Sequence, residues 1–133
     1  MRGALMVRHE AGSAAIVRRL LARDLASYDL PAGAIDDAIL VASELVGNAV
    51  RHTSAAESAT VDVSWDVDPS GVRVCVGDTG SQQPELRIPG SDEPSGRGLT
   101  IVDAMSDEWG VEGSPRGKTV WAHVPMQRPS PVR

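Results

Sequence analysis

The sequence predicts a two-layer α+β fold, an α/β sandwich in which an antiparallel or mixed sheet is covered on one face by helices. Two segments near the start have helical periodicity, and the later segments alternate as strands joined into hairpins. The helices do not alternate regularly with strands, as a parallel sheet would require. We expect one domain over residues 1–125 and a frayed tail over 126–133, where the proline content is high.

Two helices are expected before the first hairpin. The first runs from about Ser13, a candidate N-cap, to Tyr28. Pro31 separates it from a second helix over about 33–52. The apolar arc of the first helix consists of Ile16, Val17, Leu20, Leu21, Leu25 and Tyr28. The apolar arc of the second consists of Ala38, Ile39, Ala42, Leu45, Val46, Ala49 and Val50.

Strict alternation predicts a central hairpin. Every second residue of 60–67 is apolar, and the same pattern returns in 72–76. The intervening Asp68-Pro69-Ser70-Gly71 is a turn, because proline presets one dihedral angle and glycine permits a positive φ. A short strand over 3–9 is expected before the helices.

The second half of the chain predicts a loop, a helix and a last hairpin. Residues 79–95 carry few apolar groups, and a loop of this length in a small domain is typical of a lid or binding loop. A helix over about 97–106 follows it. The last hairpin joins 108–112 to 118–125.

Composition narrows the classes of function. The net charge is −5 and the isoelectric point about 5.1, which excludes a basic nucleic-acid footprint. Cys75 is the only cysteine, so no internal disulfide forms and a reducing compartment is expected. The sequence has no apolar signal core and no run of membrane length. We therefore expect a soluble cytoplasmic protein without a membrane partner.

A polar stripe follows the second helix. Glu44, Asn48 and His52 are four residues apart, so each step drifts by only about 40° around the helix. The stripe borders the apolar arc, where it is well placed to line a cleft between helix and sheet. A solvated helix flank is the simpler interpretation of this helix alone.

Two further motifs are weak when taken singly. Asp78-Thr79-Gly80 ends a strand, where the aspartate could accept a hydrogen bond from an amino group or simply start a turn. Gly96-Arg97-Gly98-Leu99 opens a helix, where free N–H groups and the helix dipole favour an anion. The alternative for this second motif is a flexible hinge at the end of the loop.

In combination these motifs resemble the GHKL ATPase superfamily, which has the Bergerat fold. The closest resemblance is to the anti-sigma-factor serine/threonine kinases of the actinobacterial type. It covers about 12–125, and its most specific box is 43–52, Ser-Glu-Leu-Val-Gly-Asn-Ala-Val-Arg-His. The other matching segments are Asp78 to Gly80, Gly96 to Val102, Trp109-Gly110 and Gly117 to Trp121.

The resemblance implies ATP and Mg²⁺ as cofactors. Asn48 would coordinate the Mg²⁺ that bridges the phosphates, and Glu44 would be the general base toward a substrate hydroxyl. Arg51 would help to balance phosphate charge. This chemistry is plausible because phosphoryl transfer depends mainly on metal, positioning and a base.

The resemblance also assigns the adenine and phosphate contacts. Asp78 would accept from the adenine amino group, Gly80 would shape the adenine pocket, and Thr119 would contribute near the adenine. The phosphates would be bound by Gly96, Arg97, Gly98 and Leu99. Many family members carry a second glycine where this chain has Gln82, which puts closure of the lid in doubt more than binding.

The function implied is that of an ATP-dependent serine/threonine kinase. Its substrate would be an anti-anti-sigma protein of the STAS type, and it would sequester a sigma factor; relatives also suggest a homodimer. One alternative is a non-catalytic module that binds ATP or ADP and sequesters a signalling partner. Another is a structural α/β domain without nucleotide.

A second phosphate-loop candidate fails on spacing. Residues 113–119, Gly-Ser-Pro-Arg-Gly-Lys-Thr, place three residues between the glycines where a P-loop requires four. A P-loop also leads into a helix, whereas Val120, Ala122 and Val124 alternate as a strand.

Overall fold

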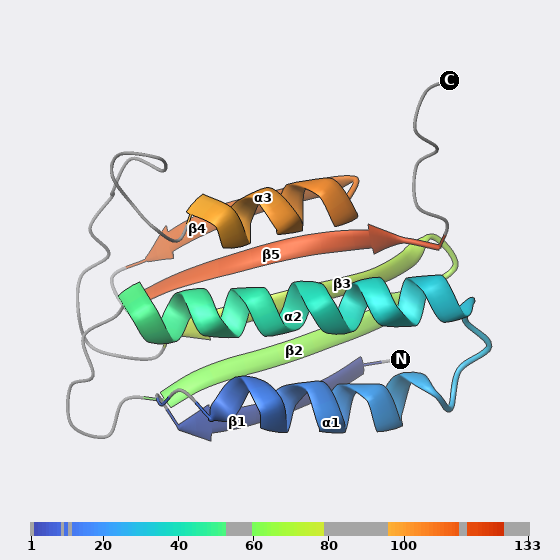
Figure 1. The fold of residues 1–133 in the computed structure, drawn as a ribbon, viewed down its shortest axis with the longest axis horizontal. Coiled ribbons are helices and arrows are strands. Elements are labelled where there is room, and N and C mark those ends of the chain that lie inside the picture. The colour runs from blue at the N-terminus through green and yellow to red at the C-terminus, as the bar shows by residue number, and fades with distance from the viewer. Residues whose placement is uncertain are drawn as a thin grey trace.

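The computed structural model describes residues 2–8, 10, 12–52, 60–78, 96–114 and 117–126. Three helices and five strands follow one another along these ranges (Figure 1). Their order is β1 (Arg2–Arg8), α1 (Ser13–Leu25), α2 (Ala32–His52), β2 (Thr60–Asp68), β3 (Gly71–Asp78), α3 (Gly96–Met105), β4 (Glu108–Ser114) and β5 (Gly117–Pro125).

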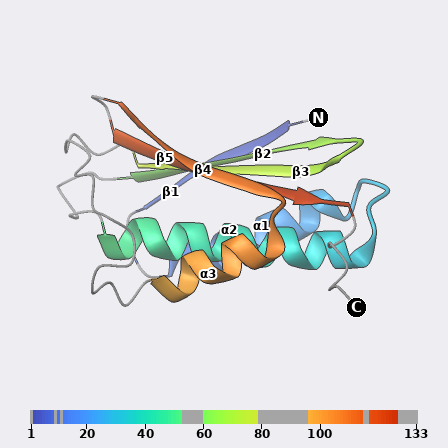
Figure 2. The same cartoon turned by 90° about the horizontal axis from the view of Figure 1, so that it is seen from above.

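The five strands form one antiparallel sheet in the order β1-β2-β3-β5-β4. All three helices lie on the same face of this sheet, and α2 lies between α1 and α3 (Figures 1 and 2). The predicted two-layer α+β architecture is therefore confirmed, with a purely antiparallel sheet.

The turn between β2 and β3 is closed by Asp68. Its Oδ1 accepts hydrogen bonds from the backbone N–H groups of Ser70 and Gly71, at 2.8 and 3.0 Å, and from Ser70 Oγ at 2.5 Å. Gly71 has a φ of 151°, and a Cβ there would lie 2.1 Å from the carbonyl oxygen of Val124. Glycine is therefore required at this position.

The core lies between the helices and the sheet. Valines from every second position of β2, β3 and β5 face the buried sides of α1 and α2. Its largest fully buried side chains are Leu21, Leu25, Leu45, Val17, Val41, Val46, Val61, Val63, Val72, Val74, Val102 and Val124. The described core is thus built mainly from valine, with leucine and alanine.

Helix α1 differs from its prediction in two respects. The cap residue is Gly12, and Ser13 is instead the first helical residue, whose Oγ donates to the carbonyl oxygen of Arg8 at 2.6 Å. Ile16 and Leu20, which we expected on the buried arc, are 43% and 39% exposed. Three helices share one sheet face, so α1 lies at the edge of the layer and only part of its arc is covered.

Candidate functional site

Helix α2 carries the polar stripe that the sequence singled out. Asn48 is polar, but it is only 9% exposed and lies among core residues of the helix. Glu44 is half-buried one turn before it. Arg51 lies in the last turn of α2, and its side chain is outside the described set. A buried amide on a helix that packs on the sheet is an informative exception to the apolar core.

The stripe lies on the side of α2 that faces α3. On the other side of α2, Arg18 of α1 donates from Nη1 to Ser43 Oγ at 3.0 Å. At about 100° per residue, Asn48 lies about 140° around the helix from Ser43. Because α1 and α3 flank α2 on opposite sides (Figure 1), Asn48 is on the flank toward α3.

Four candidate segments meet at one end of the molecule. The end of α2, the end of β3, the start of α3 and the start of β5 all lie at the left of Figure 1. Helix α2 packs against both β3 and α3. The structure thus brings Asn48, the strand end at Asp78 and the helix start at Gly96 to the same end of the fold.

Helix α3 begins at the predicted glycine motif. Gly96, Arg97, Gly98 and Leu99 form its first turn, so the backbone N–H groups that have no partner within the helix belong to these residues. Such a helix start attracts an anion through these donors and the helix dipole. Only the backbone of this turn is described, and Gly80 falls outside the described residues.

Asp78 and Thr119 occupy the neighbouring strands β3 and β5. Asp78 is the last residue of β3 and pairs with Val61 of β2. Thr119 is half-buried opposite Gly77, and alternation places it on the sheet face away from α2. Thr119 is therefore close to the end of β3 along the ladder, but it is not on the sheet face that α2 covers.

Sequence reasoning missed two polar groups near these elements. Arg18 lies outside the apolar arc of the first helix and belongs to no motif, yet it ties α1 to Ser43, which directly precedes Glu44. Asp62 lies opposite Gly77 on the adjacent strand β2. Burial raises the pKa of the Asp62 carboxyl, and its Oδ1 has no hydrogen-bond partner among the described residues. The sequence gives no signal for the Arg18–Ser43 hydrogen bond or for the pairing of Asp62 with Gly77, because each joins residues that are distant along the chain.

Comparisons with known proteins agree with this geometry. The family described as histidine kinase-like ATPase domain matches residues 7–124. A search of curated proteins gives no match. No described helix is both long and apolar enough to cross a lipid bilayer.

Three solved structures share the fold. The histidine kinase domain of a blue-light activated histidine kinase from Erythrobacter litoralis is 22% identical with a TM-score of 0.60, covering 85% of this chain and 60% of that chain. A second structure of that kinase is 26% identical with a TM-score of 0.59, covering 74% of this chain and 32% of that one. The RsbU and RsbW domains of a Mycobacterium tuberculosis protein are 22% identical with a TM-score of 0.64, covering 94% of this chain and 32% of that one.

Proposed function

This chain belongs to the family of histidine kinase-like ATPase domains within the GHKL superfamily, and we propose that it is an ATP-dependent serine/threonine protein kinase of the anti-sigma type. Membership of this ATPase family implies ATP binding. The observation that carries the proposal further is the burial of Asn48 beside the half-buried Glu44, on the α2 flank that faces α3. We propose residues 1–125 as the single catalytic domain.

The described residues fit a magnesium–nucleotide complex. Mg²⁺ prefers oxygen ligands and is commonly held by one or two protein groups together with substrate phosphates. The amide oxygen of Asn48 supplies one such group, and the free N–H groups at the start of α3 suit the phosphates. The bound metal would neutralise charge that develops on the phosphates during transfer.

The protein's own part in the reaction is to bind, orient and accept a proton. Asp78 at the end of β3 accepts from the adenine amino group, Gly80 shapes the adenine pocket, and Arg51 balances phosphate charge. In the transfer, the serine or threonine oxygen bonds to the γ-phosphorus while the bond from that phosphorus to the β,γ-bridging oxygen breaks. Glu44 takes the proton that the hydroxyl loses, and ADP leaves.

The partners follow from the type of kinase. We propose an anti-anti-sigma protein of the STAS type as substrate and a sigma factor as the sequestered partner, in the cytoplasm. Similarity over 94% of this chain to a structure that contains an RsbW domain supports the proposal of these partners. We propose that Thr119 contributes near the adenine by supporting the strand end beside Gly77.

A phosphotransfer assay with Glu44→Gln tests the proposal. The chain is incubated with radiolabelled Mg-ATP and a candidate STAS protein from the same cell, and nucleotide affinity is measured in parallel. We expect transfer to fall by about 10²–10⁴-fold while affinity is kept, because only the base is lost. Arg23→Gln, an exposed change on α1, is the matched control.

The same assay decides between the kinase and the non-catalytic module. Binding of Mg-ATP by the wild type without transfer to any candidate STAS protein would favour the module. Transfer that persists in Glu44→Gln would remove Glu44 as the base.

A further inference from the structure

Three polar side chains form a hydrogen-bonded chain at the end of the sheet away from the nucleotide segments. Ser70 lies in the turn between β2 and β3, His123 near the end of β5, and Asp107 just before β4. These segments meet at the right of Figure 1. Ser70 Oγ is 3.0 Å from His123 Nε2, and His123 Nδ1 is 2.7 Å from Asp107 Oδ1. None of the three belongs to the nucleotide site.

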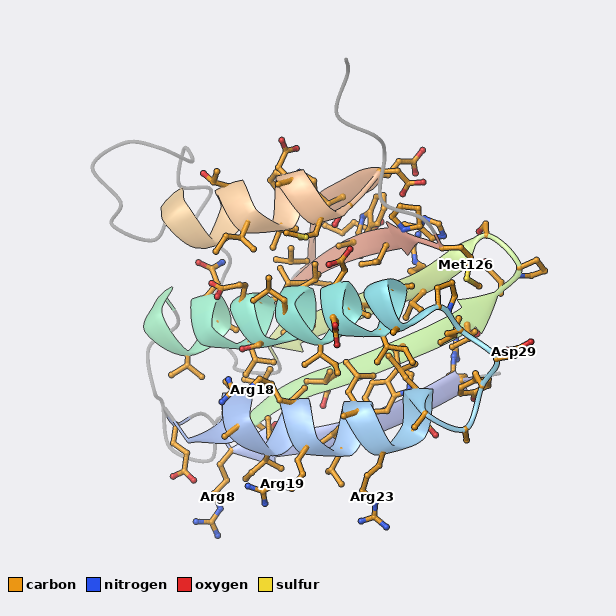
Figure 3. The ribbon with its side chains drawn as sticks, turned by 45° about the vertical axis from the view of Figure 1, so that its right-hand side comes forward. Arg8, Arg18, Arg19, Arg23, Asp29 and Met126 are labelled. Carbon is orange, nitrogen blue, oxygen red and sulfur yellow. The ribbon has the colours of Figure 1, made fainter. Side chains whose placement is uncertain are left out.

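Backbone hydrogen bonds hold the same three residues together. The N–H of Asp107 donates to the carbonyl oxygen of His123 at 3.0 Å, so this pair is joined through main chain and side chain. The carbonyl oxygen of Ser70 accepts from the N–H of Met126 at 3.2 Å. Figure 3 labels Met126 at this end of the sheet. The positions of the three side chains are therefore set by the packing of the backbone as well as by their own contacts.

The order of the three groups is that of a serine nucleophile, a base and an orienting carboxylate. The Nδ1–H of His123 donates to the carboxylate of Asp107, which leaves Nε2 of the neutral ring as an acceptor toward Ser70 Oγ. The His123 side chain is 16% exposed, whereas Ser70 is exposed at the tip of the hairpin. A base held beside an exposed hydroxyl is the arrangement that activates a serine.

A carboxylate oxygen already occupies the position that an oxyanion would take. Asp68 Oδ1 accepts from the backbone N–H groups of Ser70 and Gly71 at 2.8 and 3.0 Å. Donors of an oxyanion hole lie at about 2.7–3.1 Å. The same Oδ1 is 2.5 Å from Ser70 Oγ, close to the separation of two oxygens bonded to one tetrahedral carbon. The hydrogen bond from Ser70 Oγ, with those from the two N–H groups, lowers the pKa of the Asp68 carboxyl, so the position favours negative charge.

Asp68 blocks the reactive arrangement in two ways. Its Oδ1 fills the position between the two N–H groups, and it accepts the hydrogen bond of the Ser70 hydroxyl, whose proton is thereby directed away from His123. The Asp68 side chain is exposed, so a change of its χ1 rotamer releases both contacts. The Ser70 hydroxyl can then donate to His123 Nε2.

We propose that Ser70, His123 and Asp107 form a second reactive site, a serine acyl-transfer site for neutral esters of short acyl groups, with Asp68 as its built-in cap. Ser70 Oγ bonds to the carbonyl carbon, and His123 Nε2 takes the hydroxyl proton. The N–H groups of Ser70 and Gly71 bind the oxyanion. The bond from the carbon to the alcohol oxygen then breaks, and the alcohol leaves with the proton from His123. Water releases the acid from the acyl-serine by the same route.

The surroundings of Ser70 select the class of ester. Asp68, Asp107 and Glu108 are exposed around the site, and Glu108 lies opposite His123 in the β4–β5 ladder. These carboxylates repel an anionic substrate, so a neutral ester is favoured. The tip of a turn offers an acyl chain little surface to contact, which favours a short one. The site is independent of the nucleotide site, so it stands or falls separately from the proposed kinase activity.

Covalent labelling tests Ser70 as the nucleophile. A fluorophosphonate bonds to an activated serine oxygen with loss of fluoride, and mass spectrometry of the peptides identifies the labelled residue. We expect the wild type to be labelled at Ser70 and Ser70→Ala to lose that label. Ser27 is also exposed, and its Oγ donates to the carbonyl oxygen of Asp24, so Ser27→Ala is the control and leaves labelling unchanged. A wild type without label at Ser70 would overturn the proposal.

Hydrolysis of p-nitrophenyl acetate, measured relative to Ser70→Ala, tests the cap and the base. Asp68→Ala empties the oxyanion position and frees the hydroxyl, so the rate should rise by at least about tenfold. In that background His123→Ala should lower the rate by about 10²-fold or more. Added imidazole should restore part of it, which a purely structural role of His123 would not allow. Asp107→Asn should also lower the rate, and Asp107→Glu should retain more of it because the carboxylate is kept.

Thermal melting of each variant separates a loss of reactivity from a loss of folding. An Asp68→Ala protein that melts like the wild type but reacts no faster would overturn the role of the cap. A rate that is the same with and without the His123 imidazole would overturn the site as a whole.

Discussion

Thr119 lies directly opposite Gly77 in the β3–β5 ladder, one position before Asp78. This pairing sets where β3 ends relative to β5, and the resemblance assigns that end of β3 to the adenine pocket. Thr119 itself is on the sheet face away from the helices, because it alternates with the buried Val120.

The position of Thr119 on the face away from the helices predicts different effects for Asp78→Asn and Thr119→Val. Loss of a charged hydrogen-bond acceptor costs about 1.5–3 kcal/mol, so Asp78→Asn should weaken ATP binding by about tenfold to a hundredfold. Thr119→Val should change the affinity by less than about threefold, which corresponds to under about 0.7 kcal/mol. Isothermal titration with ATP measures both, and a larger effect at Thr119 would show that its hydroxyl reaches the nucleotide.

A second prediction concerns the contact between α1 and the sheet. Trp65 is 5% exposed, and its Nε1 donates to Asp24 Oδ2 at 2.6 Å. Asp24→Ala leaves this indole N–H buried without its acceptor, so we expect a loss of about 1–3 kcal/mol in the free energy of unfolding. Urea denaturation measures the change.

The chain offers a matched control for that contact. Trp109 Nε1 donates to Asp103 Oδ1 at 2.9 Å in an exposed setting, where water replaces the lost acceptor. Asp103→Ala should therefore cost less than about 0.5 kcal/mol. Equal losses at Asp24 and Asp103 would contradict the argument from burial.

A third prediction concerns pH. Burial raises the pKa of Asp62 above its ordinary value, so the folded state favours the protonated carboxyl. The free energy of unfolding is then highest below the unfolded-state pKa and falls as pH rises through the folded-state pKa. Asp62→Asn should raise stability at pH 7 by about 0.5 kcal/mol, a small gain because only part of the carboxyl is buried.

The gain at Asp62 should disappear toward about pH 3, where the wild-type carboxyl is protonated in both states. Urea denaturation at several pH values and low protein concentration gives the dependence. Asp36→Asn, on the exposed side of α2, is the control. A stabilisation by Asp62→Asn that did not vary with pH would rule out burial of charge as its cause.

The elements that periodicity defines were predicted closely. The second helix was expected over about 33–52 and forms Ala32–His52, because its apolar arc has the 3.6-residue period of a helix. The helix expected over 97–106 forms Gly96–Met105. The central hairpin was also predicted, with its turn at Asp68 to Gly71.

Boundaries that depend on neighbours were predicted less well. The first helix ends at Leu25 and not at Tyr28. Strand β4 continues to Ser114, where it pairs with Gly117, although we expected a turn from residue 113. That extension depends on pairing with β5, and the periodicity of β4 alone carries no information about it.

Placement in the third dimension was beyond the sequence. The burial of Asn48 depends on how α2 packs against the sheet and α3, whereas the sequence showed only that its stripe borders the apolar arc. The insertion of β5 between β3 and β4 decides that Thr119 lies beside Gly77. Strand order in a sheet is a non-local property, so no local pattern could supply either result.

The most direct test of the nucleotide site is a calorimetric titration of Mg-ATP into the wild type and Asn48→Ala, with the thermal melting of both proteins as a check on folding. The account predicts saturable binding by the wild type and a loss of at least the roughly 10–100-fold seen when a supporting residue of a metal site is removed. Equal affinity in the two folded proteins, or no binding in either, would contradict it.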